Sequence, residues 1–151
     1  MSSFHDFLGS ATRTAATELV AAFARLPEDK RDWSPGGTAR TATDQFAECV
    51  ATNNFVARMI ESRAPVPFES YESDKANAAT VSSAERDARL IASADAVVRA
   101  LKTIPDADLS SALETPMGEQ SLSEIAAVPY WNLSYHLGQI NYIASILGVP
   151  E

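Results

Sequence analysis

The chain has 151 residues, 46% of them hydrophobic, and a formal net charge of −8. This length fits one domain, and the apolar content can fill a core, which excludes a disordered or fibrous chain. The negative charge argues against nucleic-acid binding, which needs Lys and Arg to replace the counterions of the phosphates. We therefore expect a single domain over residues 1–151 and no nucleic-acid partner.

Cysteine usage and hydropathy bear on the compartment. Cys49 is the only cysteine, so no intrachain disulfide can form. The N-terminus has no basic region followed by an apolar run, and no stretch approaches the roughly 18 apolar residues that span a bilayer. These features predict a cytoplasmic protein without a membrane segment.

Two helices are predicted in the first half of the chain. Apolar residues alternately four and three positions apart, among them Leu8, Ala15 and Leu19, predict a helix over residues 3–25. Thr41 is a predicted N-cap, and a second apolar stripe continues from there to about Ser62.

The stretch 63–81 lacks a helical pattern and is predicted to be a long loop between helices two and three, of the kind that is functional or disordered. A capping box, Ser82-x-x-Glu85, begins a third helix that stops before Pro105. Residues 113–119 are compatible with a short extended stretch. With the fourth helix described next, the chain has four predicted helices joined by loops and no alternation of strand period. This pattern predicts an all-α four-helix bundle.

A second capping box, Ser121-x-x-Glu124, begins the fourth helix, which continues to Leu147 and contains Pro129. A proline inside a helix removes a hydrogen bond and clashes with the preceding turn. We therefore predict a kink or a brief break at Pro129.

Two polar residues interrupt the apolar stripe of the fourth helix. Asn132 and His136 are four residues apart, which places them on one face about 6 Å apart along the axis. A histidine at that depth can ligate a metal, carry a proton or simply be hydrogen-bonded in the core. On spacing alone, the hydrogen-bonded core pair is the better explanation, because such i,i+4 patterns arise often by chance.

Aromatic residues share another face of the same helix. Trp131, Tyr135 and Tyr142 lie at helical spacing, and the helix is apolar around most of its circumference. Such a stripe is more typical of a core or a subunit contact than of a ligand platform. It predicts a homodimer.

The C-terminal helix resembles that of the DinB-like (DinB/YfiT) superfamily. The similarity rests on the segment 130–143, in which His136-Leu-Gly-Gln matches the family's second histidine and the His-x-Gly-Gln sequence around it. Trp33-Ser-Pro-Gly-Gly is similar to the family's loop before the second helix, and residues 41–50 are similar to the start of that helix.

The resemblance implies a four-helix bundle, often dimeric, that binds zinc or nickel through one histidine of helix two and two of helix four. Carried onto this sequence, the ligand positions are Glu48, Asn132 and His136, so two of the three depart from the family pattern. Amide oxygens suit harder ions than zinc, whereas His and Glu both ligate it. Tyr135 and Gln139 are then expected to border the pocket.

Three hypotheses for function stay open. The first is a metal-dependent enzyme that acts on a small molecule, as a thiol transferase or a hydrolase, with the altered ligand set. The second is a metal-free bundle in which Glu48 and His136 pair to bind a small ligand or to stabilise the fold. The third is a dimeric interaction module without catalysis. Cys49 lies on the main apolar stripe of helix two, which indicates a buried, inert thiol rather than a nucleophile.

Overall fold

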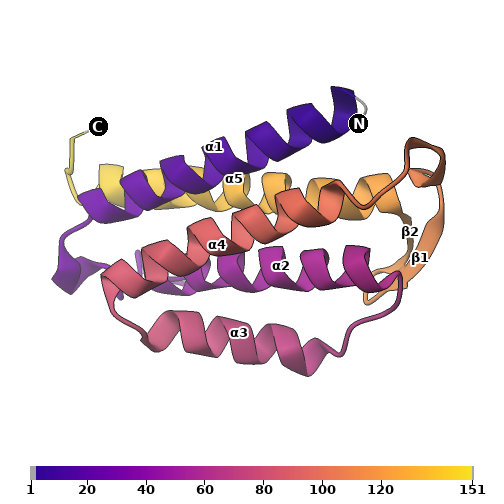
Figure 1. The fold of residues 1–151 in the computed structure, drawn as a ribbon. Helices are drawn as coiled ribbons and strands as arrows, with labels where there is room; N and C mark the ends of the chain where they lie inside the picture. The colour runs from indigo at the N-terminus through magenta and orange to yellow at the C-terminus, as the bar shows by residue number, and fades with distance from the viewer. Residues whose placement is uncertain (1–2, 151) are drawn as a thin grey trace.

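The computed structural model describes residues 3–150. Four long helices form a bundle: α1 (Ser3–Arg25), α2 (Ala42–Ser62), α4 (Ser83–Leu101) and α5 (Leu122–Ile146). Helices α1 and α2 are each in contact with both α4 and α5 and lie diagonally opposite one another. Figure 1 shows that α1 runs in the same direction as α5, and α2 in the same direction as α4. The predicted all-α four-helix bundle is confirmed.

The core of the bundle comes from the apolar stripes that the periodicity identifies. The rings of Phe23 and Phe46 pack at the centre with their centroids 4.8 Å apart, and Leu19, Leu133 and Ile140 are fully buried around them. Burying side chains of this size contributes roughly 1.5–3 kcal/mol each. This packing fixes the relative rotation of α2 and α5, which carry the candidate site.

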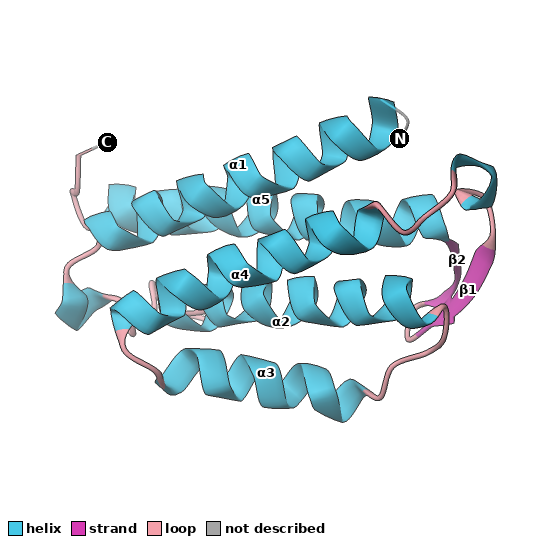
Figure 2. Cartoon of the chain, in the orientation of Figure 1, coloured by secondary structure: helices cyan, strands magenta, loops and turns pink. Residues whose placement is uncertain are grey.

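The predicted long loop between helices two and three is wrong, because most of it is a helix, α3 (Phe68–Thr80). Figure 2 shows α3 as an outer helix beside α2. Its pattern is weak because only one of its residues, Ala78, is buried, and its contacts are mainly with α2. Pro67, which reads as a breaker, occupies the N-cap, a position that needs no intrahelical N–H bond.

One buried arginine holds the far end of α3. The guanidinium of Arg86, on α4, donates to the carbonyl oxygens of Ala78, Ala79 and Val81 at 3.0–3.2 Å. These carbonyls belong to the last turn of α3, whose acceptors have no intrahelical donor. Arg86 therefore substitutes for a C-terminal cap and ties α3 to the bundle.

A small hairpin stands between α4 and α5. Strands β1 (Ala112–Thr115) and β2 (Gly118–Ser121) pair antiparallel, with Thr115 opposite Gly118. Gly118 has a φ of 99°, which favours glycine at the end of the two-residue turn. The extended stretch predicted near residues 113–119 is thus present.

Helix boundaries follow the predicted caps. Thr41 accepts from the backbone N–H of Asp44, and Ser121 forms a complete capping box with Glu124. Helix α5 continues through Pro129 without the predicted break, since one missing hydrogen bond is compensated by the buried neighbours Ile125 and Leu133.

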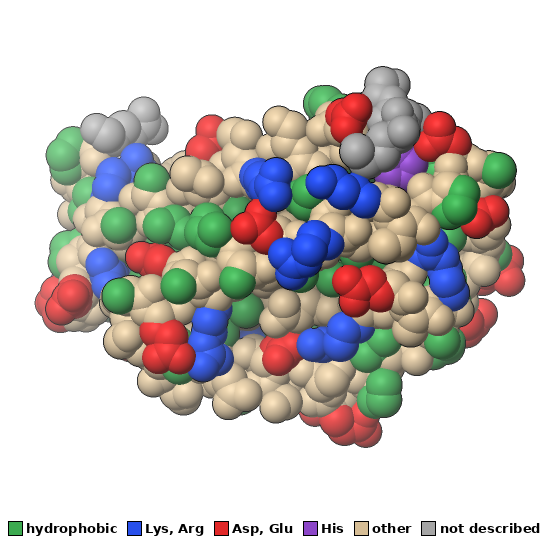
Figure 3. Space-filling model, viewed as in Figure 1, with side chains coloured by type: hydrophobic (Ala, Val, Ile, Leu, Met, Phe, Trp, Pro, Cys, Tyr) green, Lys and Arg blue, Asp and Glu red, His purple; other side chains and the backbone are tan. Residues whose placement is uncertain are grey.

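The surface of the described residues carries mixed charge. Figure 3 shows Lys and Arg side chains interspersed with Asp and Glu over α1, α3 and α4. One such pair joins Arg13 to Asp95 at 2.7 Å. None of the helices within residues 3–150 combines the length and apolarity needed to cross a membrane.

Candidate functional site

His136 is the most buried residue of the candidate site, with 1% of its surface exposed. Its Nδ1 lies 2.8 Å from Oε1 of Gln139 and 3.2 Å from Oε1 of Gln45. Gln45 donates its own Nε2 to the backbone oxygen of Arg40, at 3.2 Å, which directs Oε1 toward the imidazole. These amide oxygens favour the state in which Nδ1 carries a hydrogen and donates it to them.

The other imidazole nitrogen faces a carboxylate. Nε2 of His136 lies 3.0 Å from Oε1 of Glu48, on α2. With Nδ1 protonated, two states satisfy this contact: Nε2 carries a second proton and forms an ion pair, or its lone pair and the carboxylate share a cation. A bare lone pair facing a carboxylate would be repulsive, so either a hydrogen on Nε2 or a bound cation lies between the two atoms.

Glu48 is held in its charged form. Its Oε2 is paired with the guanidinium of Arg40 and lies 3.7 Å from Nζ of Lys75. The hydrogen bond from His136, followed by that from Arg40, outweighs the opposing effect of burial and lowers the pKa of Glu48 to about 2. Periodicity alone predicts an exposed Glu48, yet only 19% of its side chain is exposed. Arg40 from the preceding loop and Lys75 from α3 cover it.

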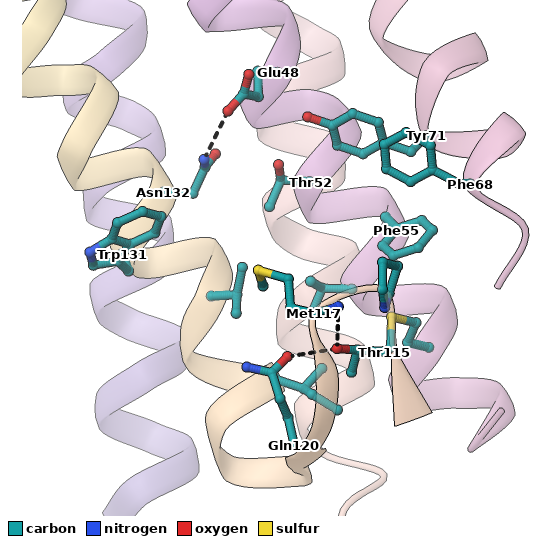
Figure 4. Close-up of a pocket in the computed structure, with 15 residues that line it drawn as sticks. Glu48, Thr52, Phe55, Phe68, Tyr71, Thr115, Met117, Gln120, Trp131 and Asn132 are labelled. Carbon is teal, nitrogen blue, oxygen red and sulfur yellow. Dashed lines mark hydrogen bonds between the residues drawn. The ribbon is translucent and has the colours of Figure 1, made fainter. Parts of the chain in front are cut away.

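Asn132 completes the cluster from α5. Its Nδ2 donates to Oε1 of Glu48 at 3.5 Å, a long contact drawn in Figure 4. Its Oδ1 is buried and has no hydrogen-bond partner among the described residues. Such an acceptor costs roughly 1–3 kcal/mol unless something binds it. The structure thus brings Glu48, Asn132 and His136 together, with one unused oxygen among them.

The donor atoms of the cluster decide which ion it can hold. Within residues 3–150, no group of three or more His, Cys, Asp or Glu side chains is placed to hold a metal. The cluster instead offers one imidazole nitrogen, one carboxylate oxygen and the unused oxygen of Asn132. Nε2 of His136 is oriented by hydrogen bonds from Nδ1 to amide oxygens, the arrangement that metal-binding histidines have. These donors fit a divalent ion, with fewer strong ligands than three histidines would give.

A cavity of about 300 Å³ opens beside Glu48 and Asn132. It lies between α2, α3, α5 and the hairpin, and Figure 4 shows its aromatic side chains. Most of its walls are apolar and come from Phe55, Met59, Phe68, Tyr71, Val128 and Trp131. The rings of Phe68 and Tyr71 stack 5.0 Å apart, and that of Phe55 meets Tyr71 edge-on. The segment 63–81 therefore borders the cavity, as a helix rather than as a loop.

Tyr135 and Gln139 lie on the other side of His136. Both line a separate hollow between α5 and the loop that carries Arg40. Gln139 orients the imidazole, while the ring of Tyr135 meets His136 edge-on and stacks on that of Trp131. Neither lines the apolar cavity.

Cys49 is fully buried, and burial raises the pKa of its thiol. This confirms the prediction of a buried thiol. Gln45, Arg40 and Lys75 are the site residues that sequence reasoning missed. Of these three, only Gln45 could be identified from the sequence, because it precedes Glu48 by one helical turn on the same face of the helix.

Comparison with known proteins gives a consistent result. A model of the DinB superfamily matches residues 11–140. YfiT from Bacillus subtilis, described as a probable metal-dependent hydrolase with an unusual four-helix bundle topology, aligns with a TM-score of 0.79 and 13% identity over 99% of this chain and 91% of its own. No curated protein matches in sequence.

Two further solved structures share the fold. The mycothiol-dependent maleylpyruvate isomerase aligns with a TM-score of 0.68 and 14% identity over 93% of this chain, which spans 63% of the isomerase chain. A protein from Streptococcus pneumoniae aligns with a TM-score of 0.67 and 14% identity over 95% of this chain and 93% of its own. At these identities the similarity concerns the fold.

Proposed function

Because this chain belongs to the DinB superfamily, we propose that Glu48, Asn132 and His136 hold a divalent metal ion and that the protein acts on a small molecule in the adjoining cavity. One observation carries the proposal: Nδ1 of His136 faces the amide oxygens of Gln45 and Gln139, while Nε2 is directed at Oε1 of Glu48. This arrangement presents a nitrogen and a carboxylate oxygen to one cation.

The residues of the chain have distinct roles in this proposal. Gln45 and Gln139 fix the tautomer of His136 so that Nε2 can serve as a ligand. Arg40 binds Oε2 of Glu48, which leaves Oε1 for the ion. Asn132 supplies the oxygen that lacks a partner. A bound divalent ion would supply Lewis acidity toward a substrate oxygen or sulfur, or a more acidic water.

The reaction class follows from the relatives and stays a proposal for this chain. YfiT is described as a probable metal-dependent hydrolase, and the isomerase depends on the thiol mycothiol. We propose hydrolysis or thiol transfer on a small molecule, with zinc or nickel as the ion. A carboxylate and an amide in place of two imidazoles predict weaker zinc binding than three histidines would give.

Metal content tests the proposal. The protein is purified without a His-tag, loaded with zinc or nickel, dialysed, and measured by plasma mass spectrometry, in parallel with Glu48→Gln and His136→Ala. Near-stoichiometric metal that falls at least tenfold in both variants is the expected result. Metal retained in both variants, or absent from all three proteins, would refute it.

A specific observation favours the metal-free alternative. Arg40 and Lys75 already place two positive charges beside Glu48, and these repel a further cation. In that case Nε2 carries a proton, and the imidazolium–carboxylate pair forms the polar end of a small-ligand site. NMR of the ring nitrogens distinguishes the two: both carry protons in the metal-free alternative, and only Nδ1 does in the metal-bound protein.

A further inference from the structure

The cavity beside Glu48 constrains the size of what it can bind. Its volume is about 300 Å³, at the small end of ligand pockets and roughly twice that of an apolar cavity that holds benzene. One aromatic ring with a short side chain fits this space. Phe55, Phe68 and Tyr71 present ring faces and edges to it, as aromatic ligands require.

The polar groups of the cavity differ between its two ends. At the hairpin, the hydroxyl of Thr115 is bonded to the backbone oxygen of Gly118, Oε1 of Gln120 and the backbone N–H of Met117, so this hydroxyl is already satisfied. At the opposite end, the carboxylate of Glu48 and the amide of Asn132 line the cavity, and Nδ2 of Asn132 donates to Oε1 of Glu48. Figure 4 shows both ends. A ligand is therefore oriented with its polar group toward Asn132 and Glu48.

The charges around the cavity restrict the ligand further. Neither Lys nor Arg is among the described residues that line it, and Glu48 is the only Asp or Glu among them. Arg40 and Lys75 reach Glu48 through Oε2 but do not line the cavity. A carboxylate or phosphate on the body of a ligand would be buried here without a counter-charge, which is costly.

We propose that this cavity selects substrates with a compact, uncharged, aromatic body and one polar group, which is presented to Glu48 and Asn132, and that the metal-free cavity rejects anionic ones. The inference rests on the proposed function, since it names the substrate class of that site. Entry is over the exposed rim formed by Met117, Phe68 and Trp131, which are 76%, 49% and 62% exposed.

Binding of two matched probes tests this selectivity. Metal-free protein, prepared with EDTA, is titrated with 2-phenylethanol and with phenylacetate, and ligand-observed NMR gives the dissociation constants. A Trp33→Phe background leaves Trp131 as the only tryptophan, so its emission reports binding at the rim. We expect saturable binding of the alcohol and at least tenfold weaker binding of the carboxylate, a difference of about 1.4 kcal/mol.

Three variants locate the effect. Val128→Phe fills the cavity and is expected to weaken binding of the alcohol at least tenfold, whereas Ile91→Phe, on an exposed position of α4, leaves it unchanged. Gln120→Lys places a cation at the hairpin end and is expected to raise the affinity for phenylacetate. Equal or tighter binding of phenylacetate to the unmodified protein, or no binding of the alcohol at 10 mM, would overturn the inference.

The two proposals fail separately. Probe selectivity without metal uptake would refute the metal site and leave the substrate class standing. Metal uptake without probe selectivity would refute the substrate class and leave the metal site standing.

Discussion

Replacing Arg86 by methionine tests how α3 is held against the bundle. The substitution keeps an unbranched apolar chain but removes the three hydrogen bonds to Ala78, Ala79 and Val81. Hydrogen bonds from a charged donor contribute roughly 1.5–3 kcal/mol each, so the three together contribute roughly 4.5–9 kcal/mol before the opposing terms are counted. Burial of the guanidinium lowers the pKa of Arg86, and the cost of removing this charge from water reduces the net stabilisation by these hydrogen bonds. Water can also reach part of the helix end. We therefore expect a loss of about 2 kcal/mol in the free energy of unfolding.

Urea denaturation followed by circular dichroism measures this loss. The matched control is Arg89→Met on the same helix, where the exposed pair with Glu85 contributes at most about 0.5 kcal/mol. Hydrogen exchange should show the amides of α3 (Phe68–Thr80) losing protection in Arg86→Met before the rest of the bundle. If the two variants unfold at the same urea concentration, Arg86 does not hold α3 and the reasoning is refuted.

Three further predictions concern the site and the surface. Because the pKa of Glu48 falls to about 2 from an ordinary 4.5, its stabilising effect is complete above pH 4.5 and disappears as the pH falls toward 2. The stability gap between metal-free wild type and Glu48→Gln should therefore shrink between about pH 6 and pH 3 in denaturation series; a constant gap contradicts this. Cys49 should resist iodoacetamide in native protein and react in urea, as read by mass spectrometry; rapid native labelling contradicts its burial. The exposed ring of Tyr142 predicts a homodimer by light scattering that Tyr142→Glu dissociates and Phe7→Glu, on exposed α1, does not; a monomeric wild type rules it out.

The bundle helices could be predicted because each buries a regular stripe. Thr41 and Ser121 also mark helix starts by their own capping chemistry, which acts over three residues. Helix α3 could not be predicted in this way, since it packs on one side only and Arg86, distant in sequence, caps its end. Pro65 and Pro67 both precede α3, and prolines so close together are typical of a loop when only the local sequence is considered.

The candidate site was predictable only in part. The resemblance to the DinB-like family pointed to Glu48 and His136, and the structure places them 3.0 Å apart. The residues that fix their chemistry come from elsewhere: Arg40 from the loop before α2 and Lys75 from α3. Arg40 lies eight residues before Glu48 and reaches it along the start of α2, whereas only the packing of α3 on α2 brings Lys75 to the site.

Anomalous diffraction from crystals loaded with zinc tests the central proposal most directly. The account predicts a peak at the zinc absorption edge about 2.0–2.2 Å from both Nε2 of His136 and Oε1 of Glu48. No peak at this position, with Nε2 and Oε1 in direct hydrogen-bond contact as in the metal-free arrangement, would contradict it and leave the imidazolium–carboxylate pair as the structure of the site.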